Sequence, residues 1–313
     1  MKRSYTKKQK KFLYVLALVA IAICLVVELI GMIPGVSFNG WSDVGIALGL
    51  TPSPVTPEGE LEVHFLDVGN ADCILVRQGD QTMLIDAGEA DDQERILKYL
   101  QQHGVQKLDL VIATHPHADH IGSMAAVIKQ YPIGRFVISF MTDESTPTTR
   151  VYTKMLEALD SCGVTVDEAV PGTEYALGTA RVQLLAPFEA VDEANDVSVV
   201  CRLSFGNRAF VFTGDAGKGV EKQMLDSSYT LRADVLKLSH HGSTSGNSEL
   251  FLYEVNPQYA VITCSEGNSY GHPHQEVVNR LLRQDIQSYR SDIHGVIVFT
   301  TDGDALTVET EKG

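Results

Sequence analysis

The spacing of apolar and polar residues divides the chain into three regions. Residues 12–30 are almost continuously apolar, and Glu28 is the one charged side chain among them. Residues 31–59 are rich in Gly, Pro, Ser and Thr, a composition typical of a semi-extended spacer. From Leu61 onwards, short apolar runs separated by Gly and Asp turns alternate with helical spacings, so we expect a folded domain to begin there.

The first half of this domain is predicted to open with three strands and then to alternate helices with strands. Apolar residues at Ile96, Leu97 and Leu100 recur at helical spacing ahead of Gly104, which indicates a helix that ends in a glycine cap. The expected strands are 61–66, 73–77, 82–85, 108–113 and 136–139, and the expected helices are 92–103, 121–128 and 152–159.

The second half is predicted to repeat these kinds of element. Gly206-Asn207 lies between two apolar runs and is a strong hairpin signal. Strand clusters with interspersed helices in two comparable halves predict a mixed α/β (α+β) domain in which helices cover two sheets. The expected strands are 181–185, 197–205, 208–212, 235–238, 259–263 and 295–300, and the expected helices are 219–225 and 276–283.

The apolar segment near the N-terminus has the length of a membrane span. As a helix it would extend roughly 28 Å, about the hydrocarbon thickness of a bilayer. No small-residue cleavage site follows it directly, which favours an uncleaved anchor over a secretory signal peptide. All the Lys and Arg residues of the tail precede it, so the positive-inside rule places the N-terminus in the cytoplasm. We expect a single-pass protein of the cell membrane with a cytoplasmic tail over 1–11, a transmembrane helix over 12–31, a linker over 32–60 and an extracellular domain over 61–313.

Charge narrows the range of partners. The formal net charge is −15, and the first eleven residues carry six positive charges and no negative ones, which leaves −21 on the rest. This acidic composition argues against a broad basic surface that binds nucleic acid. A phosphodiester substrate stays compatible, since divalent metals would supply local positive charge. The five cysteines show no Cys-x-x-Cys spacing and are expected to be buried thiols.

The strongest chemical signal is the string THPHADH at 114–120. Three imidazoles and a carboxylate within six residues suit a cation, with zinc as the first choice and manganese or iron where oxygen ligands are numerous. The string follows a buried apolar strand, and open α/β sheets place their ligands at that end of a strand. We expect His115 and His117 to point at one ion, and Asp119 and His120 at a second.

This string resembles the signature of the metallo-β-lactamase superfamily, hydrolases built as a four-layer αββα sandwich with one or two metals between the sheets. The resemblance implies that fold here. It also implies an aspartate that bridges both metals and a late histidine, each at the end of a strand. Asp215 and His241 match these positions, which leaves His240 to face the substrate. The implied metal ligands are therefore His115, His117, Asp119, His120, Asp215 and His241.

One departure from the superfamily pattern is informative. The usual additional histidine between the first motif and the bridging aspartate is missing, because 121–214 contains no His. The first ion would then have His115, His117 and Asp215, with Asn195, Asp196 or water to complete it. We expect that ion to be weaker or exchangeable, and manganese suits it because nitrogen ligands are fewer. The expected cofactors are two divalent metal ions, zinc or manganese.

The chain also resembles the metallo-β-lactamase-like domain of ComEC-type competence proteins, a family that tolerates the missing histidine. Asn70-Ala71 stands where that family more usually has Gln-Gly, in a loop bordering the site. Nothing in the chain resembles the multi-span membrane channel of the competence protein, so the resemblance supports the domain and leaves DNA transport unsupported. The match runs from about Leu61 to Gly303, and its segments are 65–72, 84–88, 195–200, 237–243 and 270–273.

Further roles follow for residues around the metals. Asp119 is expected to hold the attacking water and its ion, and His240 and His272 to donate hydrogen bonds to the developing oxyanion. For His272, a turn residue before proline is an equal alternative. Asp86 is expected to orient a ligand histidine. The other residues expected to support the ligands or to contact substrate are Asp67, Asp72, Asn195 and Ser243.

These features predict a membrane-anchored, extracytoplasmic metallo-hydrolase that uses a metal-activated water. Phosphodiester hydrolysis is the first interpretation, because the resemblance is to a competence-protein domain taken to be a nuclease. Two alternatives stay open: an esterase that acts on the choline phosphate of cell-wall teichoic acids, and a non-catalytic metal-binding module that docks a membrane partner. The substrate would be DNA or a wall polymer, and the acidic surface favours a small or wall-bound substrate over long DNA. The sequence indicates no particular protein partner.

Overall fold

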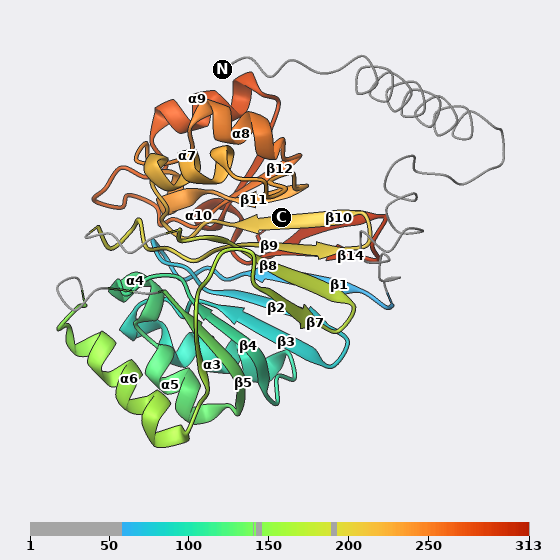
Figure 1. The fold of residues 1–313 in the computed structure, drawn as a ribbon. Helices are drawn as coiled ribbons and strands as arrows, with labels where there is room; N and C mark the ends of the chain where they lie inside the picture. Colours follow the sequence, from blue (N-terminus) through green and yellow to red (C-terminus); the bar gives the residue numbers. More distant parts are fainter. Residues whose placement is uncertain (1–57, 140, 142–145, 189–192, 313) are drawn as a thin grey trace, which may run out of the picture. The chain divides into compact units, whose positions relative to one another are not determined.

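The computed structural model describes residues 58–139, 141, 146–188 and 193–312 (Figure 1). The predicted cytoplasmic tail and transmembrane helix, and nearly all of the predicted linker, lie outside the described residues. Among the residues that are described, no helix has both the length and the apolar character that a membrane span requires.

The first sheet has eight strands in the order β15-β14-β1-β2-β3-β4-β5-β6. Strands β3 to β6 pair in parallel, whereas the other neighbours are antiparallel. In β4, Leu110 and Ile112 face the second sheet while Val111 and Ala113 face helices, and burial of both faces explains its continuous apolar run. The strands are β1 (Leu61–Phe65), β2 (Ile74–Gln78), β3 (Gln81–Ile85), β4 (Leu108–Ala113), β5 (Ile133–Ile138), β6 (Val166–Glu168), β14 (Ile297–Thr301) and β15 (Leu306–Thr310).

The second sheet has seven strands in the order β13-β12-β11-β10-β9-β8-β7. Strands β10 to β13 pair in parallel, and β9 and β10 form the predicted hairpin, with Phe205 opposite Arg208. The carboxyl ends of parallel strands meet at one edge of each sheet, where loops can bring polar side chains together. The strands are β7 (Glu174–Leu177), β8 (Ala180–Ala186), β9 (Val200–Phe205), β10 (Arg208–Phe212), β11 (Val235–Lys237), β12 (Tyr259–Ile262) and β13 (Gln287–Arg290).

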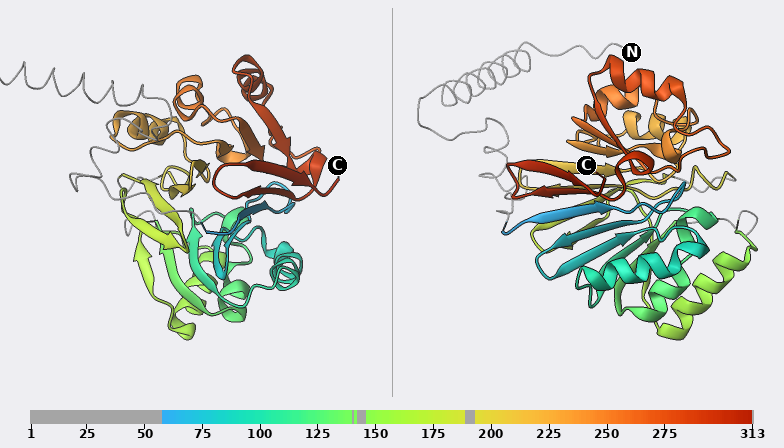
Figure 2. Two further views of the ribbon diagram at one scale, coloured as in Figure 1. Left: turned by 90° about the vertical axis from the view of Figure 1, so that its right-hand side faces the viewer. Right: turned by 180° about the vertical axis from the view of Figure 1, so that it is seen from behind.

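Four layers enclose three apolar cores. Aromatic side chains such as Phe65, Phe212 and Phe299 fill the space between the two sheets. Helices α3, α5 and α6 pack on the outer face of the first sheet, and α7, α8 and α9 pack on that of the second (Figure 2). The expectation of two sheets covered by helices is confirmed. The helices are α3 (Gln93–Gln102), α4 (Ala118–Ile121), α5 (Met124–Gln130), α6 (Arg150–Cys162), α7 (Lys218–Asp226), α8 (Glu249–Val255), α9 (Gln275–Arg283) and α10 (Ser291–His294), with 3₁₀ turns η1 (Ala90–Asp92) and η2 (Ser239–Gly242).

Several expected elements differ from the structure. The helix expected over 121–128 is divided into α4 and α5 around Gly122, where the chain lies so close to Glu89 that a Cβ would sit 2.3 Å from the Glu89 carbonyl carbon. The strand expected over 197–205 begins only at Val200, because the preceding residues form a turn. Strands β6, β7, β13 and β15 and helix α8 were not expected. All four strands lie at sheet edges and have few fully buried residues, so they lack a strong apolar pattern.

Candidate metal centre

Four side chains from both sheets converge where the parallel strands end. Asp119 and His120 lie in α4, just after β4, while Asp215 follows β10 and His241 lies in η2 after β11. Their ligand atoms all lie within 4.8 Å of one another. Asp119 and His241 are far apart in sequence, so it is the face-to-face packing of the two sheets that assembles this group.

The distances within this group suit a small divalent cation. His120 Nε2 lies 3.3 Å from Asp215 Oδ1 and 3.7 Å from Asp119 Oδ2. His241 Nε2 lies 3.4 Å from Asp119 Oδ2 and 3.9 Å from Asp215 Oδ1. Ligands of a tetrahedral zinc ion at about 2.1 Å lie roughly 3.4 Å from one another. Two imidazole nitrogens and two carboxylate oxygens at these spacings therefore fit a zinc-type site.

Unpartnered buried polar atoms mark the same place. In the part of the chain that the structure describes, six buried side-chain nitrogen and oxygen atoms have no hydrogen-bond partner, and all belong to residues at this centre or its cavity. Buried polar atoms are almost always paired in proteins, so such a concentration calls for a ligand. The six atoms are His120 Nε2, His241 Nε2, Asp215 Oδ1, Asn70 Oδ1, Asn195 Oδ1 and His272 Nδ1.

Asp86 holds the imidazole of His120 from behind. Its Oδ2 lies 2.7 Å from His120 Nδ1, and it also accepts hydrogen bonds from the backbone N–H and the hydroxyl of Thr114. Asp86 is fully buried at the end of β3 and has a left-handed backbone, with φ +58°. A proton on His120 Nδ1 leaves the Nε2 lone pair directed at the centre, the arrangement found in most histidine metal sites. The structure thus places Asp86 where it was expected to orient a ligand.

His241 is oriented by Thr263, which follows β12. Its Nδ1 lies 2.8 Å from the Thr263 carbonyl oxygen, which accepts its proton and leaves Nε2 free. Both His240 and His241 have positive φ angles, 50° and 52°, and non-glycine residues in that region persist only where their surroundings hold them. Asn247 provides that support, since its side chain bonds to the backbone of Ser239 on one side and Ser243 on the other. The sequence gave no sign of this role for Asn247 or Thr263.

A buried ion pair lies beneath the metal-binding group. Lys237 Nζ is 2.8 Å from Asp72 Oδ2, and both side chains are almost completely buried. Asp72 also accepts a hydrogen bond from Thr263 Oγ1 at 2.5 Å. Burial alone would raise the pKa of Asp72, but Lys237 and the nearby imidazoles lower it, so the carboxyl stays charged. Lys237 was not among the expected site residues, because a lone lysine in an apolar strand gives no functional signal.

The electrostatics of the group favour a bound cation. Burial by itself would lower the pKa of His120, but Asp215 and Asp86 raise it well above its ordinary value. In the same way, His120 and His241 lower the pKa of Asp215 although burial opposes this. Asp215 therefore remains ionised and creates a negative potential that attracts protons or metal ions, whereas burial raises the pKa of Asp86 although His120 opposes this.

The other half of the expected centre is less complete. His115 Nε2 lies 3.8 Å from Asp215 Oδ2 but 3.1 Å from His117 Nδ1, so the two imidazoles hydrogen-bond to each other. Neither belongs to a described set of three residues whose ligand atoms lie within 4.8 Å. Of the two groups expected to complete this half, Asn195 directs an unpartnered oxygen inwards, whereas Asp196 accepts a hydrogen bond from the backbone N–H of Gly217.

A cavity of about 500 Å³ opens over the centre. His240 and His272 form one wall, with ring centroids 5.3 Å apart, and His240 Nε2 is 3.7 Å from Asp215 Oδ2. Burial and the neighbouring imidazoles lower the pKa of His272 to about 4, so it is neutral at pH 7. None of the described lining residues is Lys or Arg. The lining comprises Asn70, Glu89, His117, Ala118, Asp119, Asn195, Asp215, His240, Tyr270 and His272.

Of the expected supporting residues, Asn195 lines this cavity, whereas Asp67 and Ser243, like Asp72 and Asp86, do not. Asp67 pairs with Lys312 at 3.2 Å, and its backbone carbonyl accepts from Arg95. Ser243 is buried and accepts hydrogen bonds from the backbone N–H and the hydroxyl of Ser245, which in turn lies 3.1 Å from His240 Nδ1. Ser243 therefore reaches the cavity only through Ser245 and His240.

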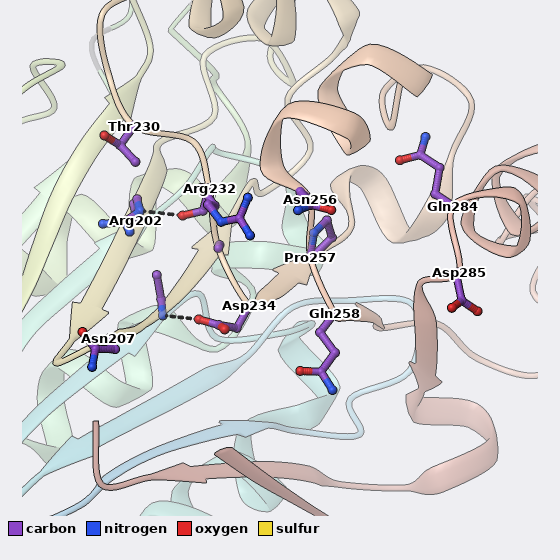
Figure 3. A pocket seen from close by; sticks show the side chains of 12 residues that line it. Arg202, Asn207, Thr230, Arg232, Asp234, Asn256, Pro257, Gln258, Gln284 and Asp285 are labelled. Atoms are coloured by element: carbon purple, nitrogen blue, oxygen red, sulfur yellow. Dashed lines mark hydrogen bonds between the residues drawn. The ribbon is translucent and has the colours of Figure 1, made fainter. Parts of the chain in front are cut away.

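A different cavity, of about 510 Å³, lies at the amino ends of β10, β11 and β12 (Figure 3). Arg202 donates from Nε to the carbonyl oxygen of Arg232, and Asp234 accepts from the backbone N–H of Ala209. Its described lining residues include no histidine. This polar hollow lacks the ligand set of the opposite edge, so we assign the metal centre to the carboxyl ends of the strands.

Comparisons with known proteins agree with the fold. The family model described as the metallo-β-lactamase superfamily matches residues 66–265. ComE operon protein 3 of Bacillus subtilis is 30% identical over 262 residues, which are 77% of this chain and 33% of that protein. Competence protein ComA of Neisseria gonorrhoeae is 29% identical over 289 residues, 91% of this chain and 38% of that protein. The chain thus spans about a third of the length of these curated relatives.

The solved structures show the same fold. Igni18, described as a novel metallo hydrolase from the archaeon Ignicoccus hospitalis, superposes with a TM-score of 0.50 at 16% identity and covers 77% of this chain and 99% of its own. At that identity the similarity concerns the fold alone. The sequence resemblance to ComEC-type competence proteins is confirmed by the two curated relatives.

Proposed function

This chain belongs to the metallo-β-lactamase superfamily, and from that premise we propose that it is a metal-dependent phosphodiesterase of the ComEC-like group. The observation that carries the proposal is the set of six unpartnered buried atoms, which gathers metal-ligand positions and substrate-facing polar groups around one cavity. Bound divalent ions would lower the pKa of water and offset the charge of a phosphoryl group.

The residues around the cavity suit a phosphodiester. A diester has a single negative charge at its phosphorus, and the wall offers the neutral imidazoles of His240 and His272 as hydrogen-bond donors. Asn195 Nδ2 lies 3.5 Å from His240 Nδ1 and can donate to it, which leaves the proton on Nε2, 3.7 Å from Asp215 Oδ2. A substrate with a further carboxylate would find no Lys or Arg among the described lining residues to pair with it.

Asp119 is placed to act on the attacking water. Its carboxylate is partly exposed to the cavity and lies 3.4 Å from His241 Nε2. Burial would raise its pKa, but His241 and His120 hold the pKa well below the ordinary value, so the carboxylate is ionised at any physiological pH. An ionised carboxylate at this position can orient a water molecule by accepting a hydrogen bond from it.

The location of the site belongs to the same proposal. A basic tail ahead of a nineteen-residue apolar segment supports a membrane anchor that holds the domain outside the cell. In that position the substrate would be DNA or a cell-wall polymer. The acidic domain and the absence of basic side chains from the described lining favour a short or locally exposed phosphodiester over a long duplex.

The proposal is tested by hydrolysis with the full-length chain purified in detergent, with its metal content measured alongside. The substrates are bis-p-nitrophenyl phosphate, p-nitrophenyl phosphorylcholine and single-stranded DNA. We expect turnover of at least one diester, which Asp119→Ala abolishes and His103→Ala, a histidine outside the cavity lining, retains. Bound metal without any turnover would reject the phosphodiesterase and favour a metal-binding module.

A further inference from the structure

The rim of the cavity carries a tyrosine that hydrolysis by itself does not require. Tyr270 lines the cavity, yet 67% of the residue is exposed. Its ring stacks on the imidazole of His272, with centroids 5.5 Å apart and planes 19° from parallel. Since one face of the ring rests on His272 and most of the residue is in solvent, the opposite face is open beside the substrate wall.

The loop that carries Tyr270 is closed by its own hydrogen bonds. Asn268 Nδ2 donates to the carbonyl oxygens of Ser265 and His272, at 2.9 and 2.6 Å, and Asn268 Oδ1 accepts from the backbone N–H of His272 at 3.0 Å. The backbone N–H of Gly271 closes the turn on Asn268. A tyrosine on so well-braced a loop keeps its orientation without burying its ring, as a binding platform requires.

The chemistry around the rim indicates what this platform holds. Tyr270 is the one large apolar side chain among the described lining residues, and none of them is basic. A flat group attached to the phosphoryl centre can therefore bind by contact with the Tyr270 ring face, whereas Asn70 and Asn195 offer hydrogen bonds. A quaternary ammonium group is best recognised by aromatic faces on several sides, whereas a planar ring needs a single face.

We propose that Tyr270 is a stacking platform for an unpaired nucleobase next to the scissile phosphodiester, an inference that rests on the proposed phosphodiesterase function. The base lies on the exposed ring face and continues the Tyr270–His272 stack, while the adjacent phosphate faces His240 and His272. A base within a duplex is already stacked on its neighbours, so the arrangement selects single-stranded DNA or strand ends. Glu89, on the cavity rim, disfavours a second phosphate at that position.

The test compares single-stranded thymidine oligonucleotides with strands of equal length and charge that contain abasic sites. With the full-length chain, we expect kcat/KM for the base-containing strand to exceed that for the abasic strand by about tenfold. Tyr270→Ala should reduce this ratio to about one, and Tyr270→Phe, which keeps the ring, should restore it. Tyr253→Ala serves as the matched control, because Tyr253 is 70% exposed on α8 and is not in the described cavity lining.

A binding measurement keeps this inference separate from the catalytic proposal. In the Asp119→Ala background, fluorescence anisotropy of a labelled strand should show weaker binding when Tyr270 is also changed to Ala, with no such loss for Tyr253→Ala. A base-to-abasic ratio that survives in Tyr270→Ala would overturn the inference while leaving the phosphodiesterase intact. A preference for p-nitrophenyl phosphorylcholine that Tyr270→Ala removes would also overturn it, in favour of a cation site. Absent turnover of every diester would reject the proposed function, and anisotropy alone would then decide whether bases stack on Tyr270.

Discussion

The buried histidine His64 and the histidines of the metal centre, His120 and His241, differ in how their ring nitrogens are bonded. His64 is buried in β1, and both of its ring nitrogens have partners: Nδ1 lies 2.9 Å from Tyr99 Oη and Nε2 lies 3.4 Å from Glu62 Oε2. At the centre, His120 and His241 each use Nδ1 for a protein partner and leave a buried Nε2 without one. A buried imidazole with two satisfied nitrogens is part of the core, whereas one with an orphaned nitrogen is prepared for a ligand.

The halves of the centre differ in the same respect. The group of Asp119, His120, Asp215 and His241 has its free atoms already directed at one point. His115 and His117 instead satisfy each other at 3.1 Å and would have to separate before both could face an ion. That the first ion is the weaker one, as the missing histidine suggested, stays a prediction.

The largest effect is expected from removing one of the orphaned nitrogens. His241→Ala should lose the ion bound by its group and reduce hydrolysis by roughly a thousandfold or more, because a metal contributes several kcal/mol to the transition state. Metal content after dialysis and turnover of bis-p-nitrophenyl phosphate measure the two effects. His64→Gln should keep both, since that histidine has no orphaned atom. Equal metal loss in His241→Ala and His64→Gln would show that an unpartnered ring nitrogen does not distinguish a metal ligand from a core histidine.

The buried ion pair of Lys237 and Asp72 has its charges satisfied within the protein, as the ring nitrogens of His64 are, so we expect it to affect stability. Lys237→Met removes the partner of Asp72 and should lower the free energy of unfolding by about 3–5 kcal/mol, because it leaves a carboxylate buried and unpaired. Urea denaturation measures this loss. The double variant Lys237→Met/Asp72→Asn removes both charges and should recover much of the stability. If the double variant is no more stable than Lys237→Met, the pair contributes through packing and not through charge.

We expect the titration of His64 to contribute to the pH dependence of the free energy of unfolding. Burial lowers the pKa of His64 from 6.5 to about 4, although Glu62 opposes this. Between these values the unfolded chain carries a proton on His64 that the folded chain lacks, so the free energy of unfolding falls as the pH falls from 6.5 to 4. The loss amounts to roughly 3 kcal/mol.

His64→Gln removes this titration, so the variant should lose correspondingly less stability than the wild type over the same pH range. Urea denaturation of both proteins at pH 7, 5.5 and 4 gives the comparison, and the difference between them cancels the titration of the metal centre. Parallel pH profiles for the two proteins would mean that His64 is protonated in the folded chain.

The smallest effect is expected from changing Asp86, which orients His120, while His120 itself is kept. Asp86→Asn keeps the shape of the side chain and tolerates the left-handed backbone at φ +58°, but it removes the charge behind His120. Metal affinity should fall by about tenfold, the lower end of what such supporting residues contribute. Competition with a coloured chelator measures the affinity. An unchanged affinity would indicate that the position of His120 is set by packing and not by the carboxylate.

The sequence by itself determined the types of ligand and the order of the elements. The THPHADH string could be interpreted because its ligands are close in sequence and follow a continuous apolar strand. The hairpin at Gly206-Asn207 could be predicted because two adjacent residues define it. Asp215 and His241 could be found only through the resemblance, since a Thr-Gly-Asp turn or a His-His pair is not specific alone. The edge strands were missed because their polar outer faces weaken the alternation on which the prediction depends.

Tertiary structure alone decided which nitrogens stay free and what stands behind them. The pairing of Lys237 with Asp72 joins the two sheets, and the support of His241 by Thr263 joins the loops that follow two neighbouring strands. No local period in a sequence records a contact of that kind, because it arises only when strands that are distant in the sequence come together. The sequence thus specified a chemistry that binds metal, and the packing of the two sheets gave that chemistry its geometry.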